Sequence, residues 1–502
     1  MQLDVDDLPP ELWHHVLEYL PRPDQRTCRL VCRAFHGLAT AMVFDRVVVT
    51  FGDWDIWDAF NGETMEGTVV TNPDAQAQRE ARTLAILDHF VADPWFAGMV
   101  KHLEVHAFEM DDGLKADTTS LMARLTAAVR TLRQLHSFVW HGQDPSLPLT
   151  LVEALSTSCP FLRILSVPMK SLPHLPLTTF RTLHTISITD AEYTRDTITH
   201  TLSTPHCTTE LPYLHTLQLP YALPADIPLD RLPHLTHLEL VSMHAYTGFG
   251  ALLRSVPRLQ SLALFSPVHE HDQAAIFGEL AAVKAHLPHL AALALQGPTP
   301  RVSVISPPEL AQLCEFVRGR AALRRLYLTF EIATADLGVW LGTVKTLPNM
   351  EIFDLRMQDQ PLDRAFLSSL TRYLPPTLSA MKLTSGGHLV NKDAFDDFWA
   401  HFTALGFLYV RTWEATAVSV QDVVRGARKL ELVGYNGLFH DVQYARPGAD
   451  AHPASDSDSG ADVDVEPLAR PPWSARRTAL RGVDDFRCEG WEWLMRHLTI
   501  VP

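Results

Sequence analysis

Hydrophobic positions recur along most of this chain in one short template: an apolar residue, two others, a second apolar residue, one other, and a third. Val100, Leu103 and Val105 fit it, and the spacing returns from Phe44 until about residue 445. Because successive strand residues point to opposite faces, the last two apolar positions share one face of a short strand. The sequence therefore predicts many short strands, each with one face in a core.

The template returns often enough to indicate a repeat architecture. Twelve intervals separate Val100 from Ala427, a mean period of about 27 residues. Several units place a proline just before the strand, as in Leu232-Pro233-His234-Leu235, where it ends a helix and favours extended backbone. The last candidate strand is Met495, Leu498 and Ile500. Helices are expected between the strands, over 78–91, 119–132, 249–255, 274–286, 308–318 and 392–403.

In period and template this array resembles the leucine-rich repeats. The resemblance implies an α/β fold, an irregular leucine-rich-repeat solenoid with a parallel concave sheet. The units lack the regular asparagine that many such repeats place after the strand, so imperfect turns are expected. An array of α-helical repeats is the alternative.

The first 43 residues follow a helical rhythm instead. Leu12, Val16 and Leu20 recur at four-residue spacing, which places them on one helix face. Pro21 breaks this helix, and Asp24 can cap the next one. Two or three short helices of this size cannot bury a robust core alone, so a partner surface is expected to cover the remaining apolar face. An amphipathic cap on the repeat array is the alternative.

Two motifs frame these helices, Leu8-Pro9-Pro10-Glu11-Leu12 and the run from Leu30 to Phe35, which reads Leu-Val-Cys-Arg-Ala-Phe. In this order they resemble an F-box, the module that docks a receptor onto the adaptor subunit of cullin–RING ubiquitin ligases. The resemblance departs at Gln25-Arg26, where the family usually has leucine after Pro-Asp. It implies that adaptor contacts are made by Leu8, Pro9, Leu12, Val16, Leu20, Leu30, Val31, Cys32 and Phe35.

Composition divides the rest of the chain. The repeats are expected over 44–445, followed by an acidic, disordered linker over 446–472 that has six acidic residues from Asp450 to Glu466 and no Lys or Arg among them. Residues 473–502 are expected to form a C-terminal cap through Trp491, Trp493, Leu494 and Leu498.

Charge and cysteine usage narrow the function classes. A formal net charge of −16 argues against nonspecific binding to nucleic acid or anionic membranes. The six cysteines, without a secretory signal, are typical of free thiols in the cytoplasm and/or nucleus. No run of about 20 apolar residues predicts a membrane span.

Sequence motifs for catalysis, cofactors or metals are weak. Phosphate-binding glycine loops and nucleophile elbows do not occur, so we expect no enzyme activity and no cofactor. The cluster His269-Glu270-His271-Asp272 is interpreted as a surface loop, and Cys28 and Cys32 have no second ligand pair, so no metal site is expected.

The combined pattern favours a substrate-recognition subunit of a Skp–cullin–F-box ubiquitin ligase. An irregular array behind an N-terminal F-box resembles a large fungal family of F-box/leucine-rich-repeat proteins. The adaptor, through it cullin, and a target protein would be its partners. The alternatives are an interaction scaffold that does not promote ubiquitination and, more remotely, an enzyme or enzyme regulator built on repeats. Outward strand positions rich in Arg and Tyr, which are enriched at binding hot spots, are expected to contact the target. These are Arg325, Tyr327, Asp354, Arg356, Lys382, Tyr409 and Arg411.

Overall fold

The computed structural model of the chain describes fifteen stretches. They are residues 9–20, 22–51, 73–108, 118–168, 171, 175, 179–188, 213–220, 234–241, 248–265, 273–296, 304–413, 418–445, 466–473 and 486–495. They form two compact units: unit 1 holds the described residues up to Pro220 together with 234 and 235, and unit 2 holds those from Thr236 onward.

Unit 1 begins with three short helices, α1 (Pro10–Glu18), α2 (Arg22–Cys28) and α3 (Arg33–Phe44). Their small core consists of Leu17, Ala39 and Met42, with Leu20, Cys28 and Leu38 packed against it. α1 starts on a proline, where the missing N–H is not needed. In α2, Gln25 is buried and its Nε2 donates to the Leu17 carbonyl at 3.0 Å. The departure from leucine at this position is thereby accommodated, because the buried amide finds a hydrogen-bond acceptor in the last turn of α1.

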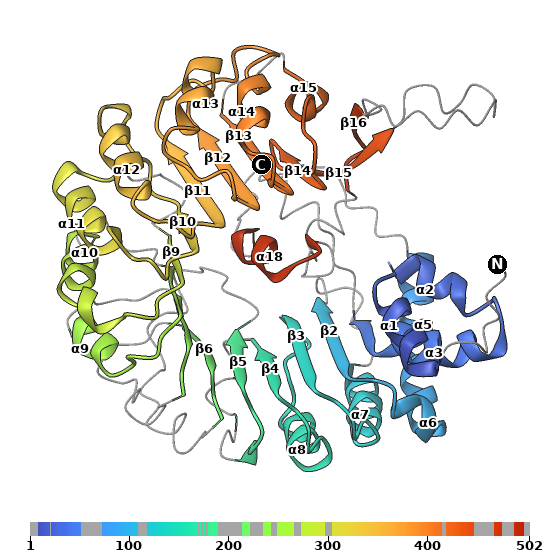
Figure 1. The fold of residues 1–502 in the computed structure, drawn as a ribbon. Coiled ribbons are helices and arrows are strands. Elements are labelled where there is room, and N and C mark those ends of the chain that lie inside the picture. Colours follow the sequence, from blue (N-terminus) through green and yellow to red (C-terminus); the bar gives the residue numbers. More distant parts are fainter. Residues whose placement is uncertain are drawn as a thin grey trace, which may run out of the picture. The chain divides into compact units, whose positions relative to one another are not determined.

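As far as residue 167 the remainder of unit 1 alternates strands with helices, and all of its strands pair in parallel (Figure 1). Template residues such as Leu103, Val105, Phe138 and Trp140 are buried beneath the helices. The strands are β1 (Arg46–Phe51), β2 (His102–Phe108), β3 (Ser137–Asp144), β4 (Ile164–Val167), β5 (Thr185–Ile188) and β6 (Thr216–Pro220). The helices are α5 (Pro73–Ala92), α6 (Pro94–Ala97), α7 (Thr118–Val129) and α8 (Leu149–Ser158).

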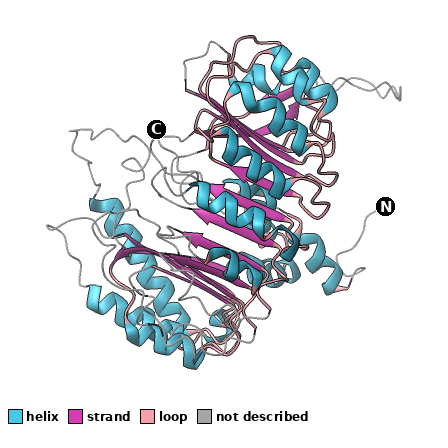
Figure 2. Ribbon diagram, turned by 90° about the vertical axis from the view of Figure 1, so that its left-hand side faces the viewer, coloured by secondary structure: helices cyan, strands magenta, loops and turns pink. Residues whose placement is uncertain are grey.

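Unit 2 continues the same strand–helix rhythm, with neighbouring strands again parallel as far as β14. Its strands are β7 (His237–Val241), β8 (Ser261–Phe265), β9 (Ala292–Gln296), β10 (Arg325–Leu328), β11 (Ile352–Met357), β12 (Ala380–Ser385), β13 (Phe407–Thr412) and β14 (Leu432–Tyr435). Its helices are α9 (Phe249–Arg254), α10 (Gln273–Ala282), α11 (Pro307–Val317), α12 (Leu337–Val344), α13 (Arg364–Leu370), α14 (Asp396–His401) and α15 (Val420–Val424), with short 3-10 turns η7 (Lys284–His286) and η8 (Thr334–Asp336). These helices cover one face of the strands (Figure 2).

The parallel order ends in an antiparallel hairpin. β14 turns through Asn436-Gly437 into β15 (Leu438–Ala445), and both turn residues have positive φ. Two residues of this type with positive φ form the tight turn whose twist matches antiparallel strands. β15 then pairs with β16 (Glu466–Ala469), so the expected linker over 446–472 is too long: its last part is strand. Residues 446–465 of that linker lie outside the described part of the chain.

The predicted repeat class is confirmed: a helical head is followed by mostly parallel strands, sixteen in the described residues, with helices between them. The candidate strand at Met495 is wrong, because Met495 ends helix α18 (Glu489–Met495), and Leu498 and Ile500 lie outside the described residues. None of the described helices is both long and apolar enough to cross a membrane.

Candidate functional site

Helices α1–α3 expose a large apolar surface. Leu12 and Val16 on α1 are about half exposed (48% and 47%), and Tyr19 just after it is 86% exposed. Leu30 and Val31, between α2 and α3, are 85% and 61% exposed. Because this segment resembles an F-box in sequence, we call these five residues the F-box apolar surface. Full burial of such a side chain contributes about 1.5–3 kcal/mol, so a surface this dense is suited to a protein partner.

The other five residues predicted for adaptor contact differ in their accessibility. Pro9 is exposed, whereas Leu20 packs against the small core of the three helices and is available only in part. Cys32 caps α3, its sulfur accepting from the Phe35 N–H at 3.5 Å, and the Phe35 ring meets Trp13 edge-on at 4.9 Å. Leu8 lies outside the described residues. Tyr19, the most exposed of the apolar surface, escaped the sequence analysis because it falls off the four-residue spacing of Leu12, Val16 and Leu20.

A second candidate surface is the face of β10–β13 opposite helices α11–α14, all in unit 2. Helix α18 packs on this face against β11 and β12 (Figure 1). The Trp491 ring stacks on Phe407 with centroids 5.7 Å apart, and Trp493 lies 6.4 Å from Tyr327. A Cβ added at Gly406 would lie 2.5 Å from the Trp491 ring. The ring can lie this close to the backbone because residue 406 is glycine and has no side chain. Within the predicted C-terminal cap, residues 489–495 thus cover a sheet face, whereas Trp473 and Phe486 pack against Phe439 of β15 at the end of the array.

This covering changes the predicted target contacts. Tyr327, Asp354, Lys382 and Tyr409 are at most 4% exposed in this structure, so a target cannot reach their side chains. The other three predicted contacts, Arg325, Arg356 and Arg411, retain partial exposure. Next to them, Trp413 is 49% exposed, and the Arg411 guanidinium lies 4.4 Å from its ring centroid. Sequence reasoning missed Trp413 because the residue lies beyond the three apolar positions of its repeat.

The buried charges on this face compensate one another. Lys382 Nζ lies 3.4 Å from Asp354 Oδ2 and 4.4 Å from the Tyr327 ring centroid. Burial raises the pKa of Asp354 against the opposing effect of Lys382 and Arg356, and burial lowers the pKa of Lys382 against the effect of Asp354. Arg356 Nε lies 3.6 Å from Glu331. These contacts pair the charged side chains of β11 with Lys382 on β12 and with Glu331.

Replacing Lys382 with Met is therefore expected to lower the free energy of unfolding by about 3–5 kcal/mol, because Asp354 would be left as an uncompensated buried charge. The pKa of Asp354 is raised in the folded state. The free energy of unfolding of the variant is therefore highest at a pH below the ordinary pKa of an aspartate, and it falls as the pH rises through the raised pKa of Asp354. Urea unfolding at several pH values measures both effects. The double variant Lys382→Met with Asp354→Leu is expected to recover most of the loss; a double variant as unstable as the single one would contradict this account.

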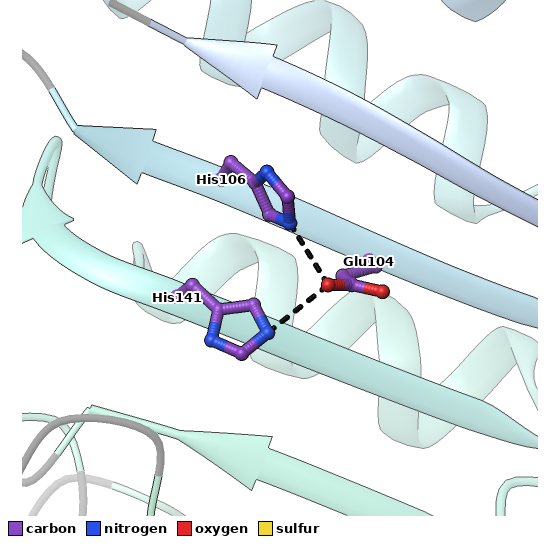
Figure 3. Close-up of side chains that lie close together, drawn as sticks. All are labelled: Glu104, His106 and His141. Atoms are coloured by element: carbon purple, nitrogen blue, oxygen red, sulfur yellow. Dashed lines mark hydrogen bonds and ion pairs between the residues drawn. The ribbon is translucent and has the colours of Figure 1, made fainter. Parts of the chain in front are cut away.

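In unit 1, three side chains of β2 and β3 converge on one point: Glu104, His106 and His141 (Figure 3). Both histidine Nε2 atoms approach the same carboxylate oxygen, at 2.8 Å for His106 and 3.1 Å for His141. Arg46 Nη2 donates to the other carboxylate oxygen at 2.7 Å. Burial by itself would raise the pKa of Glu104, but the hydrogen bonds from the two histidines and the nearby charges hold it well below the usual range. The carboxylate is therefore ionised, and the described residues offer a group of two imidazoles and one carboxylate.

Comparison with known proteins identifies the helical head. Residues 5–46 match the family model of the F-box domain. A search of curated proteins finds no match. Similar solved structures include the functional domain of InlJ from Listeria monocytogenes (13% identity, 64% of this chain and 64% of that chain covered, TM-score 0.25). Another is the Rad7 and Elc1 complex in yeast (11% identity, 83% and 96% covered, TM-score 0.29). At these scores neither structure bears on the function.

Proposed function

We propose that this protein is a substrate-recognition subunit of a Skp–cullin–F-box ubiquitin ligase. The observation that carries the proposal is the F-box apolar surface, which lies within the segment that matches the F-box domain. An F-box implies a Skp-type adaptor and, through it, a cullin. Leu12, Val16, Leu30 and Val31 would make the central contacts, with Tyr19 added to them.

The repeats would hold a target protein, and the protein itself would do no chemistry. Its contribution would be the raised effective concentration of the target near the ubiquitin-loaded enzyme. Arg411 and Trp413 are the residues best placed for target contact in unit 2, because Trp and Arg dominate binding hot spots and both side chains retain exposure. We place the protein in the cytoplasm and/or nucleus, and among F-box/leucine-rich-repeat proteins of fungal type.

Co-purification from cells with the proteasome blocked tests the function. Tagged full-length protein is expected to capture the adaptor and the cullin in comparable amounts, together with ubiquitin-modified targets. The variant Arg411→Ala with Trp413→Ala should retain adaptor and cullin and lose targets. Capture of adaptor without cullin would favour the second candidate, an adaptor-binding scaffold that does not promote ubiquitination.

A further inference from the structure

The register of β2 and β3 brings Glu104, His106 and His141 together. Glu104 and His106 are two residues apart on β2, so their side chains share one face of the strand. His141 on β3 is the parallel-register neighbour of His106. Leu103 and Val105, the alternate positions, are buried on the other face beneath the helices. The cluster therefore follows from backbone pairing and does not depend on a loop conformation.

The spacing of the three ligand atoms suits a transition metal. Zinc binds imidazole nitrogen and carboxylate oxygen at about 2.0–2.2 Å, which places tetrahedral ligand atoms about 3.3–3.5 Å from one another. The two nitrogen–oxygen distances, 2.8 and 3.1 Å, are slightly shorter than this, and all three atoms lie within 4.8 Å of one another. A metal would need each histidine nitrogen to move away from the carboxylate oxygen by a few tenths of an ångström, with the two nitrogens about 3.5 Å apart.

The surroundings support ligation as well. Glu104 and His106 are buried, whereas the His141 side chain is 31% exposed. All three side chains are therefore held by a sheet, and solvent reaches the group from the side of His141. Arg46, on β1, holds the second carboxylate oxygen and so directs the first toward the histidines. Hydrogen bonds of this kind to a ligating carboxylate orient it for the metal.

We propose that Glu104, His106 and His141 form a binding site for a zinc-class divalent transition-metal ion. Two imidazoles exclude magnesium and calcium as the preferred ions, because those take oxygen ligands. Three protein ligands leave a coordination position toward the exposed edge of His141, open to water or to a donor atom of another molecule. The ion would cross-link β2 and β3. This site is independent of the F-box, so its test is separate from that of the proposed function.

Titration of metal-free, full-length protein with Co²⁺ tests the site, because cobalt bound to nitrogen and oxygen ligands absorbs visible light. We expect one equivalent to give this absorption, and Zn²⁺ to abolish it by displacement. The variants His141→Ala and Glu104→Gln are expected to lose that equivalent. His141→Ala is the main variant, because the partly exposed His141 side chain can be removed with the least loss of stability.

Two controls address the other histidines of this histidine-rich chain. His184→Ala with His215→Ala removes a second pair of neighbouring rings in unit 1, whose centroids are 5.5 Å apart. His269→Ala with His271→Ala removes the densest histidine cluster of the sequence, which lies outside the described residues. Both controls should keep the cobalt absorption of the wild type. Absence of cobalt binding to the wild type, or equal binding to His141→Ala, would overturn the proposal.

A thermal measurement distinguishes lost ligation from lost folding. A ligand that binds only the folded state raises the unfolding midpoint, and the rise grows with the logarithm of the ligand concentration once that exceeds the dissociation constant. Zn²⁺ is expected to raise the midpoint of the wild type and of both controls and to leave that of His141→Ala unchanged. An equal rise in His141→Ala would also overturn the proposal.

Discussion

Adaptor binding is expected to disappear when Val16 and Val31 are both replaced by Glu. Each side chain is about half exposed or more in the F-box apolar surface, and a buried hot-spot residue contributes about 2 kcal/mol or more to binding. Two such losses weaken binding about a thousandfold, and the introduced charges add a desolvation cost. Calorimetric titration of purified full-length protein with a Skp-type adaptor gives the measurement.

The matched control is Val339→Glu on α12, which is 55% exposed and far from the F-box in sequence. It introduces the same charge on another exposed helix and should leave adaptor affinity unchanged. Folding of the double variant should also be preserved, because neither valine belongs to the small core of Leu17, Ala39 and Met42. Wild-type affinity in the double variant would refute the assignment of this surface to the adaptor.

Loss of the Trp491 side chain is expected to lower the free energy of unfolding of unit 2 by about 3–5 kcal/mol, the usual cost of truncating a large buried aromatic. Trp491 is 7% exposed and stacks on Phe407, so Trp491→Ala opens a gap between α18 and the sheet. Urea unfolding gives the magnitude. Hydrogen exchange should show faster exchange in 489–495 and in β11 and β12, the strands that α18 contacts.

An independent variant approaches the same contact from the sheet. Gly406→Ala places a methyl group against the Trp491 ring and should destabilise by about 1–3 kcal/mol. Gly342→Ala on α12 is the control: nothing lies within 4 Å of the added methyl, and alanine favours a helix. Unchanged stability in both Trp491→Ala and Gly406→Ala would mean that α18 does not rest on this face in solution.

Local signals accounted for much of the fold. The predicted helices over 78–91 and 308–318 correspond to α5 and α11, because prolines and apolar spacing mark them clearly. Helix α12 was missed: its sequence, Leu-Gly-Val-Trp-Leu-Gly-Thr-Val, contains two glycines and branched residues that favour helix poorly. Asn436-Gly437 is a strong hairpin signal that could have predicted the antiparallel end.

The candidate sites were predictable to different degrees. Leu12 and Leu20 belong to the same four-residue spacing, yet Leu12 is exposed and Leu20 packs against the small core. The spacing alone could not separate them, because the contacts among α1, α2 and α3 decide which apolar side chains are covered. The metal-binding group could not be predicted, since His141 is 35 residues from His106 and only strand register makes them neighbours.

The F-box and the repeat class could be predicted from local patterns, because both depend on spacing along one helix or one strand. Which outward side chains stay accessible depends on contacts between distant parts of the chain. Helix α18 is distant in sequence from the strands that it covers, and no local pattern specifies such a contact. Burial of Tyr327 beside Trp493 follows from that contact, and burial of Tyr409 beside Phe439 follows from the antiparallel strand β15.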